Sequence, residues 1–93
     1  MPITEQTAIQ LLKELTETAA VSSFEDGVRK IVARELKDCG DISHDRSGSV
    51  YCQCPSTNNG PRVLVTGHMD EVGFMVQNIT QEEFIQFVPL GGW

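Results

Sequence analysis

Apolar residues recur every three or four positions over the first 36 residues, which is the spacing of one face of a helix. The first series begins at Thr4 and predicts a helix that presents Ala8, Leu11, Leu12, Leu15 and Ala19 on one side. A second series follows a break at residues 21–23 and contains Phe24, Val28, Ile31, Val32 and Leu36. We expect Ser22 and Glu25 to form a capping box at its start, and Gly40 to end it in a left-handed conformation.

After Gly40 the apolar period changes to two, which is typical of strands. Val50, Cys52 and Cys54 fall on one side of a predicted strand, and residues 42–45 are its expected hairpin partner across a turn at 46–48. Residues 55–61 are polar and bracketed by prolines, so they predict a surface loop. A second hairpin is predicted around a turn at 80–82, with residues 74–76 and 84–88 as its strands.

Between the two predicted hairpins, residues 62–66 form a short, continuous apolar run. Such runs are typical of strands that are buried on both faces of a sheet. The run leads directly into Gly67, His68, Met69, Asp70 and Glu71. We therefore expect this polar cluster at the carboxyl end of a buried strand, where open α/β sheets bind their ligands.

Composition narrows the function classes. The chain has 93 residues, enough for one small domain, and a formal charge of -6 from 13 acidic and 7 basic residues. This charge argues against nucleic acid or an anionic membrane as partners. No apolar run is long enough to span a membrane and the first residues do not form a signal peptide, so a cytoplasmic location is expected. The three cysteines are an odd number and are interpreted as reduced thiols.

His68 is the candidate metal ligand. A neutral imidazole binds zinc, cobalt or manganese best when a carboxylate holds its other ring nitrogen. Asp70, two residues further in extended geometry, lies on the same face, whereas Glu71 would point away. On spacing alone, the His-x-Asp pattern is more often a structural histidine at a strand end beside a surface acid than a metal site. His44 stands between polar residues and is interpreted as an exposed structural residue.

Two other chemistries find no support in the sequence. Ser22 and Ser23 have no histidine partner within reach and are explained by helix capping, which disfavours a serine hydrolase. Gly91 and Gly92 stand alone and form no glycine-rich phosphate loop.

The order of the segments resembles the start of the tetrahedral, or glutamyl (deblocking), aminopeptidases, which are di-metal metallopeptidases. The most specific match is Gly67-His68-Met69-Asp70-Glu71-Val72-Gly73-Phe74-Met75-Val76. Further matches, in the same order as in the family, are residues 11–15, 21–26 with 28–29, 45–50 and 87–93. The family usually has Gly-Asn where Gly48-Ser49 stands and a glycine in place of Ser23; both are turn or cap positions.

This resemblance implies an α/β fold, namely the N-terminal part of a zinc-exopeptidase-type core with two helices and then strands. Residues 1–71 would belong to the catalytic domain, and residues 72–93 would begin an inserted β-rich assembly domain. His68 would bind one of two divalent ions (zinc, cobalt or manganese), and Asp70 would orient it as part of the catalytic machinery. Peptides would be the substrates, and the complete protein would form a homo-oligomer, from a dimer to a dodecamer.

The remaining ligands and the general-base glutamate are expected beyond Trp93, and the turn residues Glu82 and Glu83 are poor candidates for the base. Because a catalytic metal needs about three protein ligands, we expect residues 1–93 alone to be inactive and to hold metal poorly. Two alternatives stay open. One is an endoglucanase-like hydrolase, although no recognisable carboxylic acid pair supports it. The other is a truncated, non-catalytic assembly module.

Overall fold

The computed structural model describes residues 3–93, which form two helices followed by two separate antiparallel hairpins. The helices are α1 (Glu5–Glu17) and α2 (Asp26–Leu36). Strands β1 (Asp41–His44) and β2 (Val50–Gln53) form the first hairpin. Strands β3 (Gly73–Ile79) and β4 (Ile85–Leu90) form the second. Both predicted helices and both predicted hairpins are therefore present, with boundaries shifted by a few residues.

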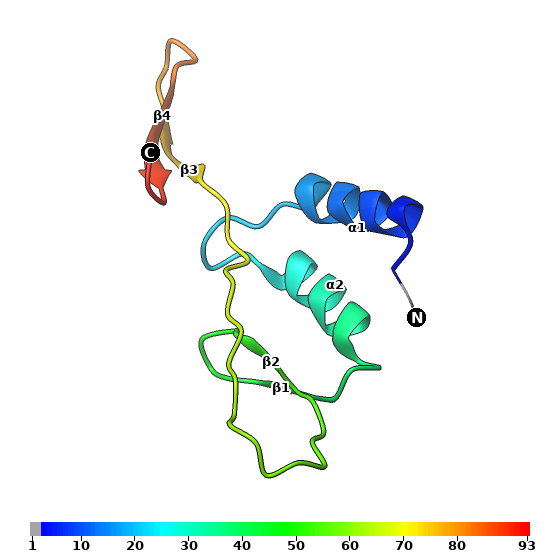
Figure 1. The fold of residues 1–93 in the computed structure, drawn as a ribbon. Coiled ribbons are helices and arrows are strands. Elements are labelled where there is room, and N and C mark those ends of the chain that lie inside the picture. The colour runs from blue at the N-terminus through cyan, green and yellow to red at the C-terminus, as the bar shows by residue number, and fades with distance from the viewer. Residues whose placement is uncertain (1–2) are drawn as a thin grey trace.

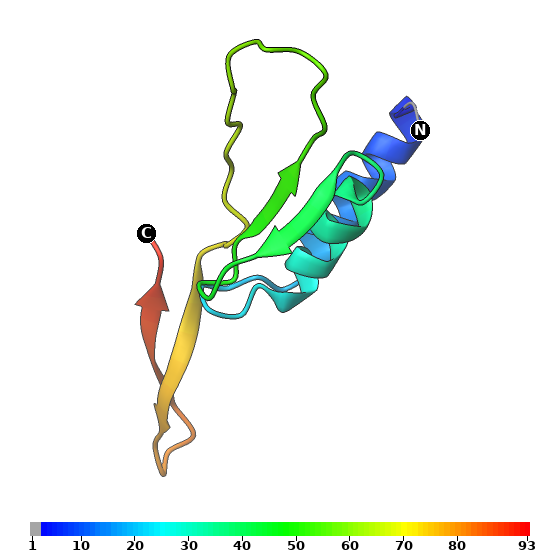
Figure 2. The ribbon, with the colours of Figure 1, turned by 90° about the horizontal axis from the view of Figure 1, so that it is seen from below.

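The chain is elongated rather than compact. Its radius of gyration is 17.9 Å and its extents are 64 × 32 × 20 Å, whereas a compact domain of this length has a radius of gyration of about 12 Å. The β3–β4 hairpin projects away from the helices and from the first hairpin (Figure 1). Seen from below, β1 and β2 lie alongside α2 (Figure 2). Within residues 3–93, only Ala20, Val28 and Ile31 are buried.

Helix α1 begins with a capping box made by two threonines. The Thr4 hydroxyl accepts the Thr7 N–H at 3.2 Å, and the Thr7 hydroxyl accepts the Thr4 N–H at 2.9 Å. This arrangement satisfies donors that a helix start otherwise leaves without partners.

The capping box predicted for the second helix is wrong. Helix α2 begins after Glu25, and no side chain caps it. Glu25 instead accepts the N–H of Ser23 at 2.9 Å, and Ser23 has a left-handed φ of 70°. The Glu25 carboxylate therefore stabilises the tight turn before the helix rather than the helix itself.

The predicted role of Gly40 is also wrong. Helix α2 ends at Leu36, with Lys37 in a right-handed conformation, and Gly40 is not among the glycines with positive φ. A Cβ atom on Gly40 would lie 2.3 Å from the carbonyl oxygen of Gln53. Glycine is needed here because the start of β1 passes close to the backbone that follows β2.

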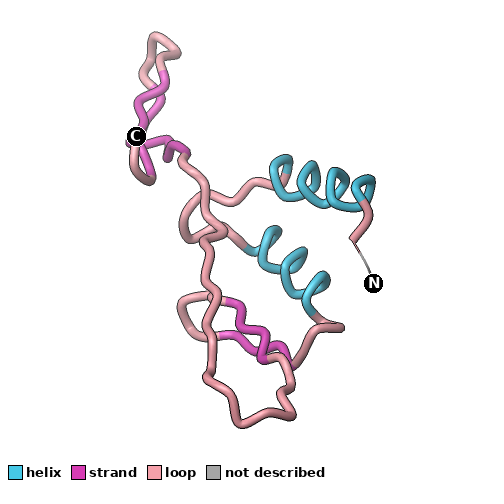
Figure 3. Tube along the Cα trace, in the orientation of Figure 1, coloured by secondary structure: helices cyan, strands magenta, loops and turns pink. Residues whose placement is uncertain are grey.

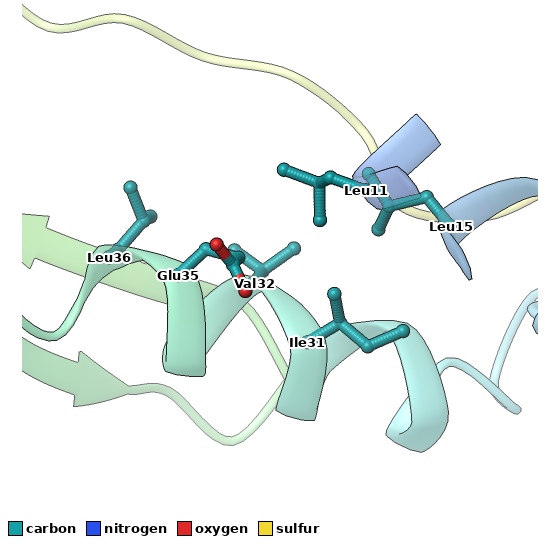
Figure 4. Close-up of a pocket in the computed structure, with 6 residues that line it drawn as sticks. All are labelled: Leu11, Leu15, Ile31, Val32, Glu35 and Leu36. Carbon is teal, nitrogen blue, oxygen red and sulfur yellow. The ribbon is translucent and has the colours of Figure 1, made fainter. Parts of the chain in front are cut away.

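Helices α1 and α2 face each other across an open apolar hollow (Figure 4). Leu11 and Leu15 approach it from α1, while Ile31 and Val32 approach it from α2. The apolar sides predicted for the two helices are thus turned toward each other. In residues 3–93, no helix has the length and apolar character needed to cross a membrane.

The strand predicted at residues 62–66 is not formed. Figure 3 draws the whole path from the end of β2 to the start of β3 as loop. Val63, Leu64 and Val65 are 82%, 80% and 89% exposed. The prediction fails because a buried strand needs neighbouring strands, and within residues 3–93 each sheet consists of one hairpin.

Candidate metal site

The loop that carries His68 and Asp70 is anchored at its end to the connection between α1 and α2. Glu71 and Val21 form an isolated parallel bridge. The Glu71 N–H donates to the carbonyl oxygen of Ala20 at 2.8 Å. Next to this bridge, Gly73 packs so closely against Val21 that a Cβ atom would lie 2.6 Å from Cγ2. The site loop is therefore tied to the part of the chain that holds the buried Ala20.

His68 and Asp70 are in direct contact. The His68 Nδ1 lies 3.0 Å from the Asp70 Oδ1 and 3.0 Å from the Asp70 carbonyl oxygen. Both partners are acceptors, so a neutral His68 carries its proton on Nδ1 and leaves the lone pair on Nε2. The His68 side chain is 85% exposed, and that of Asp70 is 39% exposed. An imidazole held in this way presents Nε2 as a metal ligand.

His68 and Asp70 line an open hollow of about 540 Å³ together with the turn of the first hairpin and α2. The turn contributes Ser47, Gly48 and Ser49, and α2 contributes Val32 and Leu36. The sequence predicts only a turn at residues 46–48 and does not indicate that this turn lines the same hollow as His68. No local signal could have indicated it, because the hollow brings together segments about twenty residues apart.

Asp45 shapes this turn. Its Oδ1 accepts the N–H groups of Ser47 and Ser49, both at 2.9 Å, and its Oδ2 accepts the Tyr51 hydroxyl at 3.0 Å. These hydrogen bonds, above all that from the Ser49 backbone, hold the pKa of the Asp45 carboxyl below its usual value. Gly48 completes the turn with a φ of 89°, which a side chain rarely adopts.

The other candidate residues lie elsewhere. His44 is on β1, paired with Val50, and is not among the residues that line the hollow. Glu71 is hydrogen-bonded to the connection between α1 and α2, where its Oε1 accepts the Ala20 N–H at 3.1 Å. The cysteines are free thiols; Cys52 donates to the Leu36 carbonyl oxygen at 3.5 Å, and desolvation raises its pKa. A raised pKa keeps this thiol neutral and lowers its value as a ligand.

The residues present fit one position of a metal site rather than a closed site. Across residues 3–93, no three His, Cys, Asp or Glu side chains come close enough together to hold an ion. Catalytic metals generally take about three protein ligands. His68, with Nδ1 held by Asp70 and Nε2 exposed, has the donor chemistry of one such ligand.

The chain is similar to several known aminopeptidases. The family model described as M42 glutamyl aminopeptidase matches residues 48–93, which include both His68 and Asp70. Escherichia coli K12 FrvX is 45% identical over 86 residues, covering 91% of this chain and 24% of its own length. The glutamyl aminopeptidase of Lactococcus lactis is 39% identical over 84 residues, covering 88% of this chain and 24% of its own length.

A solved structure shows the same fold. The TET aminopeptidase of a marine sediment archaeon, Thaumarchaeota archaeon SCGC AB-539-E09, superposes with a TM-score of 0.84 at 36% identity. This match covers 95% of the present chain and 25% of that protein. The α/β fold class, with two helices before the strands as in the N-terminal part of that enzyme, is thereby confirmed.

The chain belongs to the M42 glutamyl aminopeptidase family of metallopeptidases. It spans about a quarter of the length of the relatives that it matches. FrvX, the Lactococcus lactis enzyme and the archaeal enzyme are all named as aminopeptidases, and none of these names refers to the hydrolysis of glucans.

Proposed function

We propose that this chain supplies one metal ligand, His68, and the carboxylate that orients it, Asp70, to a metal-dependent aminopeptidase. The observation that carries the proposal is the pair of 3.0 Å contacts from His68 Nδ1 to Asp70, which leave Nε2 available on an 85% exposed ring. Family membership gives this local geometry its meaning, because a histidine beside an aspartate has many other uses.

Each residue has a distinct task in this proposal. His68 binds the ion through Nε2, and Asp70 keeps the proton on Nδ1 and the ring in one orientation. A bound divalent ion supplies polarisation of the scissile carbonyl and activation of a water. The hollow beside His68 would receive the N-terminal end of a peptide, with the turn at residues 47–49 as one wall.

The finer features of the complete enzyme are also proposals. The complete enzyme would hold two divalent ions, which would be zinc, cobalt or manganese, since these metals accept imidazole and carboxylate ligands. Residues 1–71 would form part of the catalytic domain and residues 72–93 the start of an inserted assembly domain. The separate β3–β4 hairpin in Figure 1 supports this division. The enzyme would act on peptides as a cytoplasmic homo-oligomer.

A chimera tests the proposal. Residues of this chain would replace the aligned 84-residue segment of the Lactococcus lactis glutamyl aminopeptidase, which supplies the rest of an active site. We expect the chimera to release N-terminal glutamate from a peptide, and to lose this activity when a chelator removes its metal. His68→Ala should reduce turnover by about 100-fold or more, because it removes a metal ligand.

His44→Ala in the same chimera is the matched control. It removes an imidazole from β1 that does not line the hollow, and should leave turnover within about two-fold of the parent. A His68→Ala chimera that keeps its activity and its metal content would contradict the proposed role. Loss of activity in both variants with unchanged metal content would contradict it as well.

A further inference from the structure

Glu71 binds both polar groups of the Ala20 backbone. Its N–H donates to the Ala20 carbonyl oxygen at 2.8 Å, and its Oε1 accepts the Ala20 N–H at 3.1 Å. Ala20 is only 3% exposed, so its backbone groups depend on protein partners rather than on water. These two hydrogen bonds form a ring that ties Glu71 to the buried backbone of Ala20.

The same peptide unit connects this ring to the candidate ligand. The carbonyl oxygen of Asp70 lies 3.0 Å from His68 Nδ1 and accepts a hydrogen bond from its N–H. The N–H on the other side of that peptide bond belongs to Glu71 and donates to Ala20. Because a peptide unit is planar, any rotation that breaks the bond to Ala20 also turns the Asp70 carbonyl away from His68.

We propose that Glu71 is a positioning residue: by clamping Ala20, it fixes the Asp70–Glu71 peptide plane and so keeps the His68 proton on Nδ1. This inference rests on the proposed function and adds a third residue to it. The His68 ring is 85% exposed and has little packing to orient it, so its orientation depends on hydrogen bonds. The Asp70 carboxylate supplies one, and the carbonyl fixed by Glu71 supplies the other.

A merely structural brace would give different behaviour. Such a brace would change the stability of the chain when removed, but it would not change which nitrogen of His68 carries the proton. The tautomer of His68 therefore separates the two roles. It is read from the ring ¹⁵N chemical shifts.

The experiment compares the full 93-residue chain with Glu71→Ala, Glu71→Gln and Glu82→Ala. Glutamine keeps an oxygen acceptor for the Ala20 N–H, and Glu82 lies in the β3–β4 turn away from the site. We expect the Nδ1–H tautomer to dominate in the parent, in Glu71→Gln and in Glu82→Ala. In Glu71→Ala, the population of the other tautomer should rise several-fold, and manganese affinity should fall by about 10-fold.

An unchanged tautomer in Glu71→Ala, or an equal change in Glu71→Gln, would overturn the proposal. If Glu71→Ala does not fold, hydrogen exchange of the Ala20 amide in the parent decides: protection of at least about 10-fold supports the clamp, and exchange at the unfolded rate overturns it. A His68→Ala chimera that keeps its activity and metal content would refute the proposed function, whereas the His68 tautomer in Glu71→Ala tests the role of Glu71 separately.

Discussion

Arg34 of α2 reaches across to Glu14 of α1 and binds its carboxylate through both terminal nitrogens. The Nη1–Oε1 distance is 2.9 Å, and the Nη2–Oε2 distance is 2.7 Å. This bidentate pair joins the two helices, which bury few residues between them. The hydrogen bonds from Arg34 lower the pKa of Glu14 below its ordinary value of 4.5.

Arg34→Ala should therefore lower the stability of the chain slightly near neutral pH. Glu14 has a depressed pKa in the folded state, so its contribution is present above pH 4.5 and is lost as the pH falls through the lowered value. The difference between parent and variant should shrink in strong acid and at high salt, because both charges are exposed. Urea unfolding at several pH values measures this.

Lys13→Ala is the control for that series, since Lys13 forms only an exposed 4.0 Å pair with Glu17 on the same helix. It should have less effect than Arg34→Ala at neutral pH. A stability difference for Arg34→Ala that is as large in strong acid as at neutral pH would count against the pair.

Asp45→Ala should loosen the turn beside His68, because it removes the acceptor for Ser47, Ser49 and Tyr51. The pKa of Asp45 is also depressed, so the turn should weaken as the pH falls through that lowered value, where the carboxyl gains a proton. Hydrogen exchange of the Ser49 amide reports the opening. Asp38→Ala, in the connection before β1, should leave this exchange rate unchanged, and equal acceleration in both variants would refute the assignment.

Gly40→Ala should destabilise the first hairpin by about 1–3 kcal/mol, because the added methyl group would overlap backbone atoms of Gln53 and Cys54. These atoms belong to the main chain and cannot move aside cheaply. Gly60→Ala is a matched control, since a Cβ atom there meets no atom within 4 Å. Chemical unfolding of the two variants gives the comparison; equal stabilities would show that the close approach at Gly40 does not exist.

The exposed apolar run at residues 63–65 should make the chain self-associate. Leu64→Lys places a charge in the middle of this run and should shift sedimentation toward the monomer. Thr57→Lys adds the same charge in the polar loop and should not. A monomeric profile for the parent chain would contradict this expectation.

The sequence predicts elements well where the pattern is local. Residues 8–19 and 24–36 carry a helical apolar period, and both helices form; the alternation around Val50 and Phe74 likewise yields hairpins. The residues that cap the helices are harder to predict from the sequence. Ser22 and Glu25 fit a capping box, but the left-handed Ser23 redirects the Glu25 carboxylate into the turn.

Long-range relationships account for the remaining differences. The apolar run at residues 62–66 predicts burial, but it does not indicate which strands would cover it. The pairing of His68 with Asp70 is predicted by their spacing, because two residues in extended geometry share a face. The clamp of Glu71 on Ala20 joins residues 51 positions apart, and no local pattern indicates it.

Manganese titration of the chain, followed by NMR, tests the central claim most directly. Manganese prefers imidazole and carboxylate over thiols, and its paramagnetism broadens the signals of the nuclei that lie near it. We predict that the His68 ring signals broaden at a manganese concentration that leaves the His44 ring signals sharp, and that Asp70→Ala weakens this effect. Equal broadening of both histidines, or broadening of His44 alone, would contradict the account.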